Sequence, residues 1–449
     1  MGIRADGLGV GSPFLFDVPD LPDAEAYLAR MIAASHASPP DGLPGDVAPL
    51  RHAAVVGAGI MGRGIAYALA RTGVDVQLID PSLAQLEAAR ADVARWDGRA
   101  GTTHAKTIRT TPDLGCSAAA EFVVEAVPED LDLKRSIFSS LDVMTSPHAI
   151  LASNTSTLDI DAIAASTSRP ARVIGTHFFL PAHVTALVEV VPGRDTAAGV
   201  TMATTRLARS LGKVTVIAGN CDGFIGNRLF DRWHQEAMYL VEEGASPTQI
   251  DAALEHWGMA IGPFRTLDLI DNRLPWRVRQ RRARSDSRLA QPRIGDRMCE
   301  AGFAGRATGA GWYLYEAQTR ERRENPQVRT LACQCAAELS ITRRELSDEE
   351  IIGRCMVAVV SEGLNIVAEG YGRRHSDIDL TFCLGYGFPT AQGGPLRLAS
   401  RLDPEALSEW SRVCQSMAQR GKTRVLTVPD LNLLRAGLES NTSPSTAEH

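Results

Sequence analysis

The sequence predicts an α/β fold in which a doubly wound parallel sheet is followed by a duplicated all-α C-terminal domain. Between residues 51 and 220, short apolar runs alternate with helical stretches, which is typical of a mostly parallel sheet covered by helices. After about Gly223 the strand signal fades, and one pattern occurs twice, as EAMYLVEEG (236–244) and EGLNIVAEG (362–370). Each copy precedes an Ile-Asp pair and then a Gly-Pro pair, so we expect a helical unit whose copies pack together.

We expect the chain to divide into segments of different composition. A short helical stretch near the N-terminus is followed by sequence rich in proline and glycine, and the chain ends in polar residues. The expected segments are an N-terminal helix and linker remnant (1–50), an α/β domain (51–220), a first helical domain (221–320), a second helical repeat (345–420) and a disordered tail (439–449).

Composition narrows the classes of function. The chain has 449 residues, of which 44% are hydrophobic and 22% are charged, as in ordinary globular proteins. Its formal net charge of -6 argues against nucleic acid as a partner. The 8 cysteines include no C-x-x-C pair, which favours reduced thiols. Because the sequence lacks a secretory signal and a run of about 18 apolar residues, we expect a cytoplasmic protein with no membrane contact.

A glycine motif lies directly after the first predicted strand and before a helical stretch. The predicted strands are the apolar runs at 53–56, 76–79, 122–124, 149–152, 173–178 and 187–191. In a G-x-G-x-x-G motif, the glycines permit a tight turn, the approach of a pyrophosphate and close packing of helix on strand. The residues expected to contact the dinucleotide here are Gly57, Gly59, Ile60, Met61 and Gly62.

Asp80 ends the second apolar run, at the distance of about 20 residues that the dinucleotide fingerprint requires. A carboxylate at this position accepts hydrogen bonds from the ribose hydroxyls and repels a 2′-phosphate. The sequence therefore predicts a Rossmann-type domain that binds NAD rather than NADP. The alternative is a glycine-rich turn in another α/β fold.

Polar residues at the ends of later runs are candidates for chemistry at the same edge of the sheet. His177 lies at the end of the 173–178 run, and an imidazole titrates near neutral pH, as a general base should. Glu189 lies within the next apolar run, where a buried carboxylate needs a partner such as that imidazole. Asn154 and Ser156 lie in a polar loop after the 149–152 run. Taken alone, each of these residues, like Asn227 farther along, also has an ordinary structural interpretation.

Longer motifs give a resemblance that covers about residues 50–420. The chain resembles the L-3-hydroxyacyl-CoA dehydrogenase family, and most closely the dehydrogenase half of multifunctional fatty-acid β-oxidation enzymes. The second helical repeat of the multifunctional members is matched by YGFPTAQGGPL (386–396). The other matching stretches are VVGAGIMGRGIA (55–66), FVVEAVPEDLDLKRSIFSSLD (122–142), ILASNTSTLDI (150–160), GTHFFLPAHVTALVEVVPG (175–193), DGFIGNRL (222–229) and GRATGAGWYLYE (305–316).

The resemblance implies NAD-dependent oxidation of an L-3-hydroxyacyl-CoA to a 3-oxoacyl-CoA, with the acyl thioester in a cleft between the domains. His177 would be the general base, and Glu189 would orient it and stabilise the imidazolium. Ser156 and Asn227 would hydrogen-bond the reacting oxygen. The resemblance also places further residues beside the cofactor: Glu125 and Lys134 near cofactor and substrate, and Asn154 at the nicotinamide end.

Several departures from the family pattern bear on the substrate. Leu180 stands where the family usually has Asn, Ala307 stands where it usually has Lys, and the region between Asp80 and Glu125 is short. Because the family's helical protrusion in that region helps to bind CoA, the alternative substrates are an acyl group on a carrier protein or a small hydroxy acid. The position opposite Asn227 in the second repeat is Gly353 or Arg354, so we expect that repeat to be structural.

Other expectations concern partners and additional sites. We expect no hydratase activity, because the hydratase half of the multifunctional enzymes is absent. We also expect either a homodimer or an intrachain pseudo-dimer of the helical domains.

We expect no metal, because His177 and His183 lack a suitably spaced third ligand. The basic stretch 276–288 is interpreted as a solvated, mobile loop in preference to a site for CoA phosphates. A non-catalytic partner in an assembly is the alternative of a different class.

Overall fold

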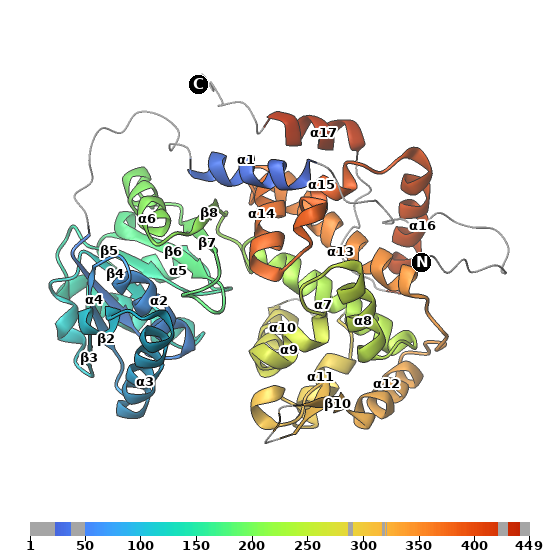
Figure 1. Cartoon of the computed structure of the whole chain (residues 1–449), viewed down its shortest axis with the longest axis horizontal. Helices are drawn as coiled ribbons and strands as arrows, with labels where there is room; N and C mark the ends of the chain where they lie inside the picture. The colour runs from blue at the N-terminus through green and yellow to red at the C-terminus, as the bar shows by residue number, and fades with distance from the viewer. Residues whose placement is uncertain are drawn as a thin grey trace. The chain divides into compact units, whose positions relative to one another are not determined.

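The computed structural model describes residues 23–36, 50–285, 291–316, 319, 321–420 and 430–440 (Figure 1). These residues form two compact units. The sheet unit comprises Ala26–Arg228 with Ile366–Tyr386, and the helical unit comprises Leu229–Asn365 and Gly387–Leu438 with the residues before Ala26. The expected domain boundaries stay predictions. Within the expected N-terminal segment, residues 37–49 lie outside the described residues. The expected disordered tail (439–449) lies outside them from residue 441, whereas residues 439 and 440 end a helix.

The sheet unit contains a sheet of 8 strands in the order β3-β2-β1-β4-β5-β6-β7-β8. Neighbouring strands are parallel except β6 and β7, which are antiparallel. The order of the first six strands is that of a doubly wound dinucleotide-binding sheet, which confirms the predicted fold class. The strands are β1 (His52–Val56), β2 (Asp75–Ile79), β3 (Ile108–Thr111), β4 (Phe122–Glu125), β5 (Ile150–Ser153), β6 (Val173–Phe178), β7 (Leu187–Pro192) and β8 (Val214–Ile217).

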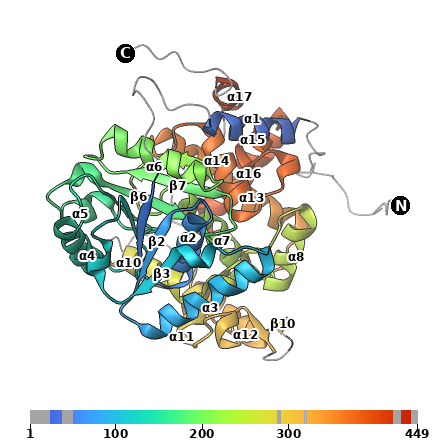
Figure 2. The same cartoon turned by 60° about the vertical axis from the view of Figure 1, so that its left-hand side comes forward.

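Helices cover the sheet because its central strands are apolar on both faces. Side chains of α2, α3 and α6 share one hydrophobic core with the strands, in which Val55 and Leu78 are fully buried. A further helix, α14 (His375–Tyr386), packs on β7 and β8 in the same unit. Figure 2 turns the sheet unit toward the viewer. The other helices of this unit are α2 (Ile60–Ala70), α3 (Leu83–Ala100), α4 (Leu131–Met144), α5 (Ile160–Ala164) and α6 (Ala198–Ser210), with most of α1 (Ala24–His36).

The helical unit is built from the two sequence repeats and the helices around them. Apart from helices, its described part has a short antiparallel pair of strands, β9 (Tyr313–Tyr315) and β10 (Arg322–Glu324). In each repeat a long helix, α7 or α13, comes before a helix with proline in its first turn, α9 or α15. The helices are α7 (Gly226–Glu243), α8 (Pro247–Trp257), α9 (Pro263–Ile270), α10 (Arg273–Ser285), α11 (Ile294–Glu300), α12 (Pro326–Glu338), α13 (Asp348–Ala368), α15 (Pro395–Ala399), α16 (Pro404–Arg420) and α17 (Leu431–Ser440).

A buried arginine joins the two long helices of the helical unit. Arg354 of α13 is 3% exposed and lies 2.5 Å from Glu236 of α7. Its guanidinium also pairs with both oxygens of Glu243, at 2.6 and 2.9 Å. Burial lowers the pKa of Arg354, but the two glutamates raise it above its ordinary value. Arg354, one of the two residues that the sequence placed opposite Asn227, is therefore a structural link between the repeats.

The helix α10 corrects the expectation of a mobile loop at 276–288 as far as residue 285, and residues 286–288 lie outside the described part of the chain. Residues 273–285 form a helix, and two of its arginines form ion pairs with carboxylates of other helices. Arg279 lies 2.8 Å from Asp296, and Arg282 lies 2.6 Å from Asp231. These ion pairs hold a basic stretch in a helix that its sequence alone did not indicate.

One described helix meets the length and composition expected of a membrane span. This helix is α13, which has a mean hydropathy of 1.6 over its most apolar window, and 78% of that window is buried inside the protein. Because its apolar surface is covered by other parts of the chain, α13 has the character of a core helix.

The stability of the helical unit is expected to decrease as pH rises toward neutrality because of Asp251. This carboxyl is 2% exposed and accepts a 2.6 Å hydrogen bond from the Tyr313 hydroxyl. Burial raises its pKa from 3.8 to about 7, so between these values the folded chain holds a proton that the unfolded chain releases. The free energy of unfolding then falls with pH by up to about 1.4 kcal/mol per pH unit.

Chemical denaturation of the wild-type protein and the Asp251→Asn variant at pH values between 4 and 8 would test this expectation. The variant should show a weaker dependence on pH, and Asp195→Asn, at an exposed position, should behave like the wild type. Identical pH slopes in wild type and Asp251→Asn would contradict it.

Candidate active site

The glycine motif forms the loop between β1 and α2, and at two of its three glycines the structure leaves no room for a side chain. Gly57 has a φ of +103°, and a Cβ there would lie 2.6 Å from the carbonyl oxygen of Ala126. A Cβ at Gly62 would lie 1.8 Å from the carbonyl oxygen of Gly57, whereas nothing lies within 4 Å of a Cβ at Gly59. The open side at Gly59 and the absence of a side-chain cap on α2 leave backbone N–H groups able to bind an anionic ligand.

Asp80 connects this loop to the end of β2. Its Oδ2 accepts a 2.8 Å hydrogen bond from the backbone N–H of Ala58, and its Oδ1 accepts one of 2.8 Å from Ser82. A carboxylate has further lone pairs with which it can accept from ribose hydroxyls. Of the two residues between Gly59 and Gly62, which begin α2, Ile60 is 64% exposed and Met61 is half-buried. The loop, the helix end and the carboxylate thus fit a dinucleotide.

His177 and Glu189 face each other across β6 and β7. They are partners in the antiparallel register, and His177 Nδ1 lies 2.6 Å from Glu189 Oε2. Glu189 is fully buried, and its other oxygen accepts hydrogen bonds from the backbone N–H groups of Ile225 and Gly226, at 3.1 and 2.8 Å. The carboxylate is therefore fixed at both oxygens, and it directs Nε2 of the imidazole to the opposite side of the ring.

The loop after β5 brings the other polar residues together. Asn227 donates a 2.9 Å hydrogen bond from Nδ2 to the carbonyl oxygen of Ser156. Asn154 Oδ1 accepts a 2.9 Å hydrogen bond from the N–H of Phe178, which follows His177. The four expected catalytic residues thus form two pairs, His177 with Glu189 and Ser156 with Asn227, and Asn154 links their strands.

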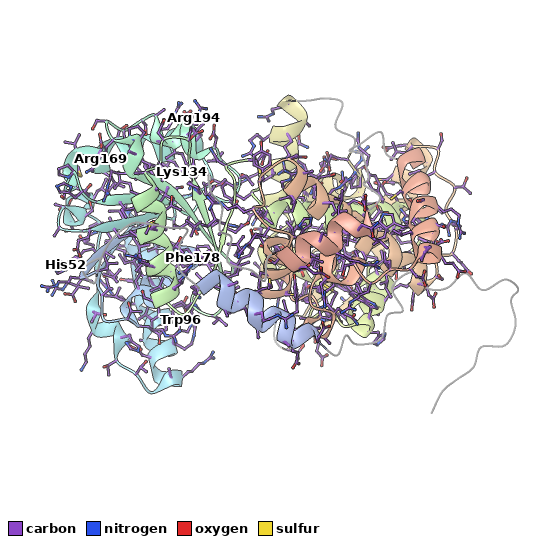
Figure 3. All side chains as sticks on the ribbon, turned by 90° about the horizontal axis from the view of Figure 1, so that it is seen from above. His52, Trp96, Lys134, Arg169, Phe178 and Arg194 are labelled. Atoms are coloured by element: carbon purple, nitrogen blue, oxygen red, sulfur yellow. The ribbon has the colours of Figure 1, made fainter. Side chains whose placement is uncertain are left out.

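A buried ion pair lies beneath this loop. Lys134 of α4 is 1% exposed and Glu125 is fully buried, and they lie 2.7 Å apart (Figure 3 labels Lys134 and Phe178). The hydroxyl of Ser153 donates to the other oxygen of Glu125 at 2.7 Å. Since both partners are buried, Lys134 supports the strand ends, and direct contact of Glu125 or Lys134 with a cofactor stays a prediction.

Glu129 is a residue of this site that the sequence analysis did not single out. Its Oε1 accepts hydrogen bonds from the backbone N–H groups of Ser156 and Thr157, both at 3.0 Å, and from the hydroxyls of Thr155, Ser156 and Thr157. Burial raises the pKa of Glu129, but the charge of Lys134 and these hydrogen bonds bring it below its ordinary value. An ionised Glu129 therefore holds the loop that carries Ser156.

Within the described ranges, no group of three or more His, Cys, Asp or Glu side chains is placed to hold a metal ion.

A doubly wound sheet with a glycine loop after β1 and an imidazole–carboxylate pair at the carboxyl end of its strands is the arrangement of a dinucleotide-dependent dehydrogenase. Residues 52–221 match the family model described as 3-hydroxyacyl-CoA dehydrogenase, NAD binding domain. Residues 223–315 match that described as 3-hydroxyacyl-CoA dehydrogenase, C-terminal domain. The chain belongs to the 3-hydroxyacyl-CoA dehydrogenase family, and NAD is the cofactor of its sheet unit.

Individual relatives agree with this assignment. The chain is 38% identical over 381 residues to a peroxisomal bifunctional enzyme of Danio rerio, covering 80% of this chain and 53% of the relative. Two solved structures are also similar: 3-hydroxybutyryl-CoA dehydrogenase from Escherichia coli K12 and (S)-3-hydroxybutyryl-CoA dehydrogenase from Ralstonia eutropha. The first has 26% identity and a TM-score of 0.71, with 88% of this chain and 100% of that chain covered. The second has 34% identity and a TM-score of 0.56, with 60% and 100% covered.

The chain spans about half the length of the curated relatives that it matches. The first of these relatives are peroxisomal enzymes by name, so the cytoplasmic location expected from the sequence stays untested.

Proposed function

We propose that the chain oxidises the 3-hydroxyl group of an L-3-hydroxyacyl-CoA to a ketone and produces a 3-oxoacyl-CoA, a step of fatty-acid β-oxidation. The observation that carries this proposal is the 2.6 Å contact between His177 Nδ1 and the buried Glu189. His177 lies near the carboxyl end of β6, and the glycine loop follows the carboxyl end of β1. NAD, when bound, supplies the acceptor for the hydride that leaves C3 of the substrate.

His177 is the general base in this proposal. Nδ1–H donates a hydrogen bond to Glu189 and keeps its proton, so Nε2 has a free lone pair that can accept the proton of the substrate hydroxyl. The negative charge of Glu189 stabilises the imidazolium that forms, and this effect is strong because the carboxylate is fully buried. The backbone N–H groups of Ile225 and Gly226 keep the carboxylate in place during the step.

Ser156 and Asn227 hold the reacting oxygen in this proposal. Asn227 Nδ2 has two hydrogens, of which one is donated to the Ser156 carbonyl, so the other can donate to the oxygen at C3. The Ser156 hydroxyl lies 3.2 Å from Glu129, longer than the other bonds to that oxygen, so it can turn toward the substrate. Both donors stabilise the negative charge that develops on the substrate oxygen as its proton leaves.

The proposal is tested by NADH absorbance at 340 nm with L-3-hydroxyacyl-CoA substrates of short, medium and long chains and with the D enantiomer as control. We expect NADH to form with at least one L substrate and none of the D substrates. Absence of turnover with every L substrate, in protein that binds NAD, would contradict the proposed reaction.

The Asp80→Ala variant should change the preference between the two dinucleotides. The carboxylate that would accept from the ribose and repel a 2′-phosphate is lost, so we expect the ratio of kcat/KM for NAD to that for NADP to fall about tenfold or more. Asp75→Ala, at the opposite end of β2, is the matched control and should keep the wild-type ratio. An unchanged ratio in Asp80→Ala would rule out this role for Asp80.

The same chemistry on an acyl carrier protein or a small hydroxy acid is the second candidate. Two observations favour it: α3 is the single α-helix between Asp80 and Glu125, and Leu180, beside the His177 strand, is 44% exposed. Comparing kcat/KM on acyl-CoA and acyl-carrier-protein forms of one substrate separates the two. A non-catalytic partner would instead fail to bind NAD in a thermal-shift assay.

A further inference from the structure

The helix α14, in the second helical repeat, lies within the sheet unit, and the residues that precede it are bonded to that unit at two points. Gly219, after β8, donates a 2.8 Å hydrogen bond to the carbonyl oxygen of Tyr371. Arg228 pairs with both oxygens of Glu369, at 2.6 and 3.2 Å. These contacts precede α14 directly, and the helix itself packs on β7 and β8. The end of α14 therefore has a defined position relative to the strand that carries Glu189.

Tyr386, the last residue of α14, contacts the site through its hydroxyl. Tyr386 Oη donates to Oδ1 of Asn227 at 3.4 Å, while Nδ2 of the same amide donates to the carbonyl oxygen of Ser156 at 2.9 Å. An asparagine amide can turn by 180° with little change in shape, so its orientation depends on its partners. A donor on one side and an acceptor on the other select the orientation in which Nδ2 lies toward the Ser156 loop.

The aromatic ring of Tyr386 contacts the site by a second route. It packs edge-on against Phe179 with centroids 5.5 Å apart, and the Phe179 ring lies 4.7 Å from the imidazole of His177. Phe179 is held between two glycines, because a Cβ at Gly226 would lie 2.7 Å from its ring and one at Gly385 would lie 3.0 Å from it. The end of α14 thus limits the movement of the side chain that packs on His177.

We propose that Tyr386 is a positioning residue of the active site: its hydroxyl fixes the Asn227 amide, and its ring supports Phe179 against His177. The inference rests on the proposed function, because it assumes that Asn227 and His177 act on the substrate. The proposal also gives the second repeat a different role from the one that the sequence predicted. The absence of an amide opposite Asn227 predicted a purely structural repeat, whereas this repeat supplies the group that orients Asn227.

The Tyr386→Phe variant removes the hydroxyl and keeps the ring. Loss of one hydrogen bond to the amide should lower kcat about fivefold. KM for NAD and the midpoint of thermal unfolding should not change. If Tyr386 had only a structural role, the midpoint of thermal unfolding would fall instead. Tyr371→Phe, which also removes a single hydroxyl but outside the site, is the matched control and should keep the wild-type kcat. A wild-type kcat in Tyr386→Phe would overturn the proposal.

A double-mutant cycle with Asn227→Ala tests the route of the effect. In the Asn227→Ala background, Tyr386→Phe should change kcat by less than about twofold, because the partner of the hydroxyl is gone. An equal loss in both backgrounds would show that the hydroxyl does not act through Asn227. If the wild-type protein itself turned over no 3-hydroxyacyl substrate, the proposed function would fail and this inference with it. An active wild type with an equally active Tyr386→Phe variant would overturn this inference alone.

Discussion

Replacing His177 by alanine is expected to lower kcat by about 10²–10⁴-fold, the range found when a general acid–base group is lost. The imidazole is the proposed acceptor of the hydroxyl proton, and its contact with the buried Glu189 fixes the ring and its tautomer. Binding of NAD should remain, because the glycine loop and Asp80 are unchanged. The loss should therefore appear in kcat and not in the affinity for NAD.

The Glu189→Gln variant tests the tautomer of His177 more specifically, because it keeps the size of the side chain at position 189. Glu189 accepts from Ile225 and Gly226 at one oxygen and from His177 at the other. A glutamine that keeps its oxygen toward the two backbone N–H groups must turn its NH2 toward Nδ1 of His177. Nδ1 then becomes an acceptor and the proton moves to Nε2, which can no longer act as a base. We expect kcat to fall about 10²-fold or more.

Steady-state NADH formation and NAD titration of both variants would check these expectations. His148→Ala is the matched histidine control, since His148 is exposed and lies at the opposite end of the strands. It should retain the wild-type kcat. A His177→Ala variant with undiminished turnover would remove the proposed mechanism, and a fully active Glu189→Gln variant would remove the tautomer argument.

The central strands could be predicted from sequence because buried parallel strands are continuous apolar runs. The two edge strands could not. β3 (Ile108–Thr111) and β8 (Val214–Ile217) have 4 residues each, and polar side chains such as Arg109 or Thr215 interrupt their apolar pattern. The helix α10 was also missed, because its arginines find carboxylates on elements distant in the sequence. Tertiary ion pairs of this kind leave no local pattern.

The site shows the same division between local and distant signals. The pairing of His177 with Glu189 was predictable, because a carboxylate in an apolar strand requires a partner and the neighbouring strand offers an imidazole. Glu129 was not, since it is one of several acids in a polar loop and its donors lie beyond the next strand. Tyr386 was still less accessible, because its contact with Asn227 spans 159 positions of the chain. Residues of this kind can be assigned to the site only once the folded structure is known.

The Arg354→Met variant is expected to lose about 3–5 kcal/mol of stability, the cost of leaving buried charges without their partner. Arg354 is 3% exposed and pairs with Glu236 and Glu243, which are 5% and 4% exposed. Without the guanidinium, two carboxylates remain close together in a poorly solvated place, and methionine offers them no donor. Urea denaturation at pH 7 should show this loss, and the loss should be smaller at pH 5. The reason is that uncompensated buried carboxylates have raised pKa values, so protonation stabilises the folded variant as pH falls.

The neighbouring pair of Arg344 with Glu350 provides the control, because it has the same chemistry on the surface. Arg344→Met should cost less than about 1 kcal/mol, since an exposed ion pair is screened by water. Adding Glu236→Gln and Glu243→Gln to Arg354→Met should recover part of the loss, because the unpaired charges are removed. Equal costs for Arg354→Met and Arg344→Met would show that burial does not make the inner pair different. The link between the repeats would then depend on apolar packing between α7 and α13, and not on the arginine.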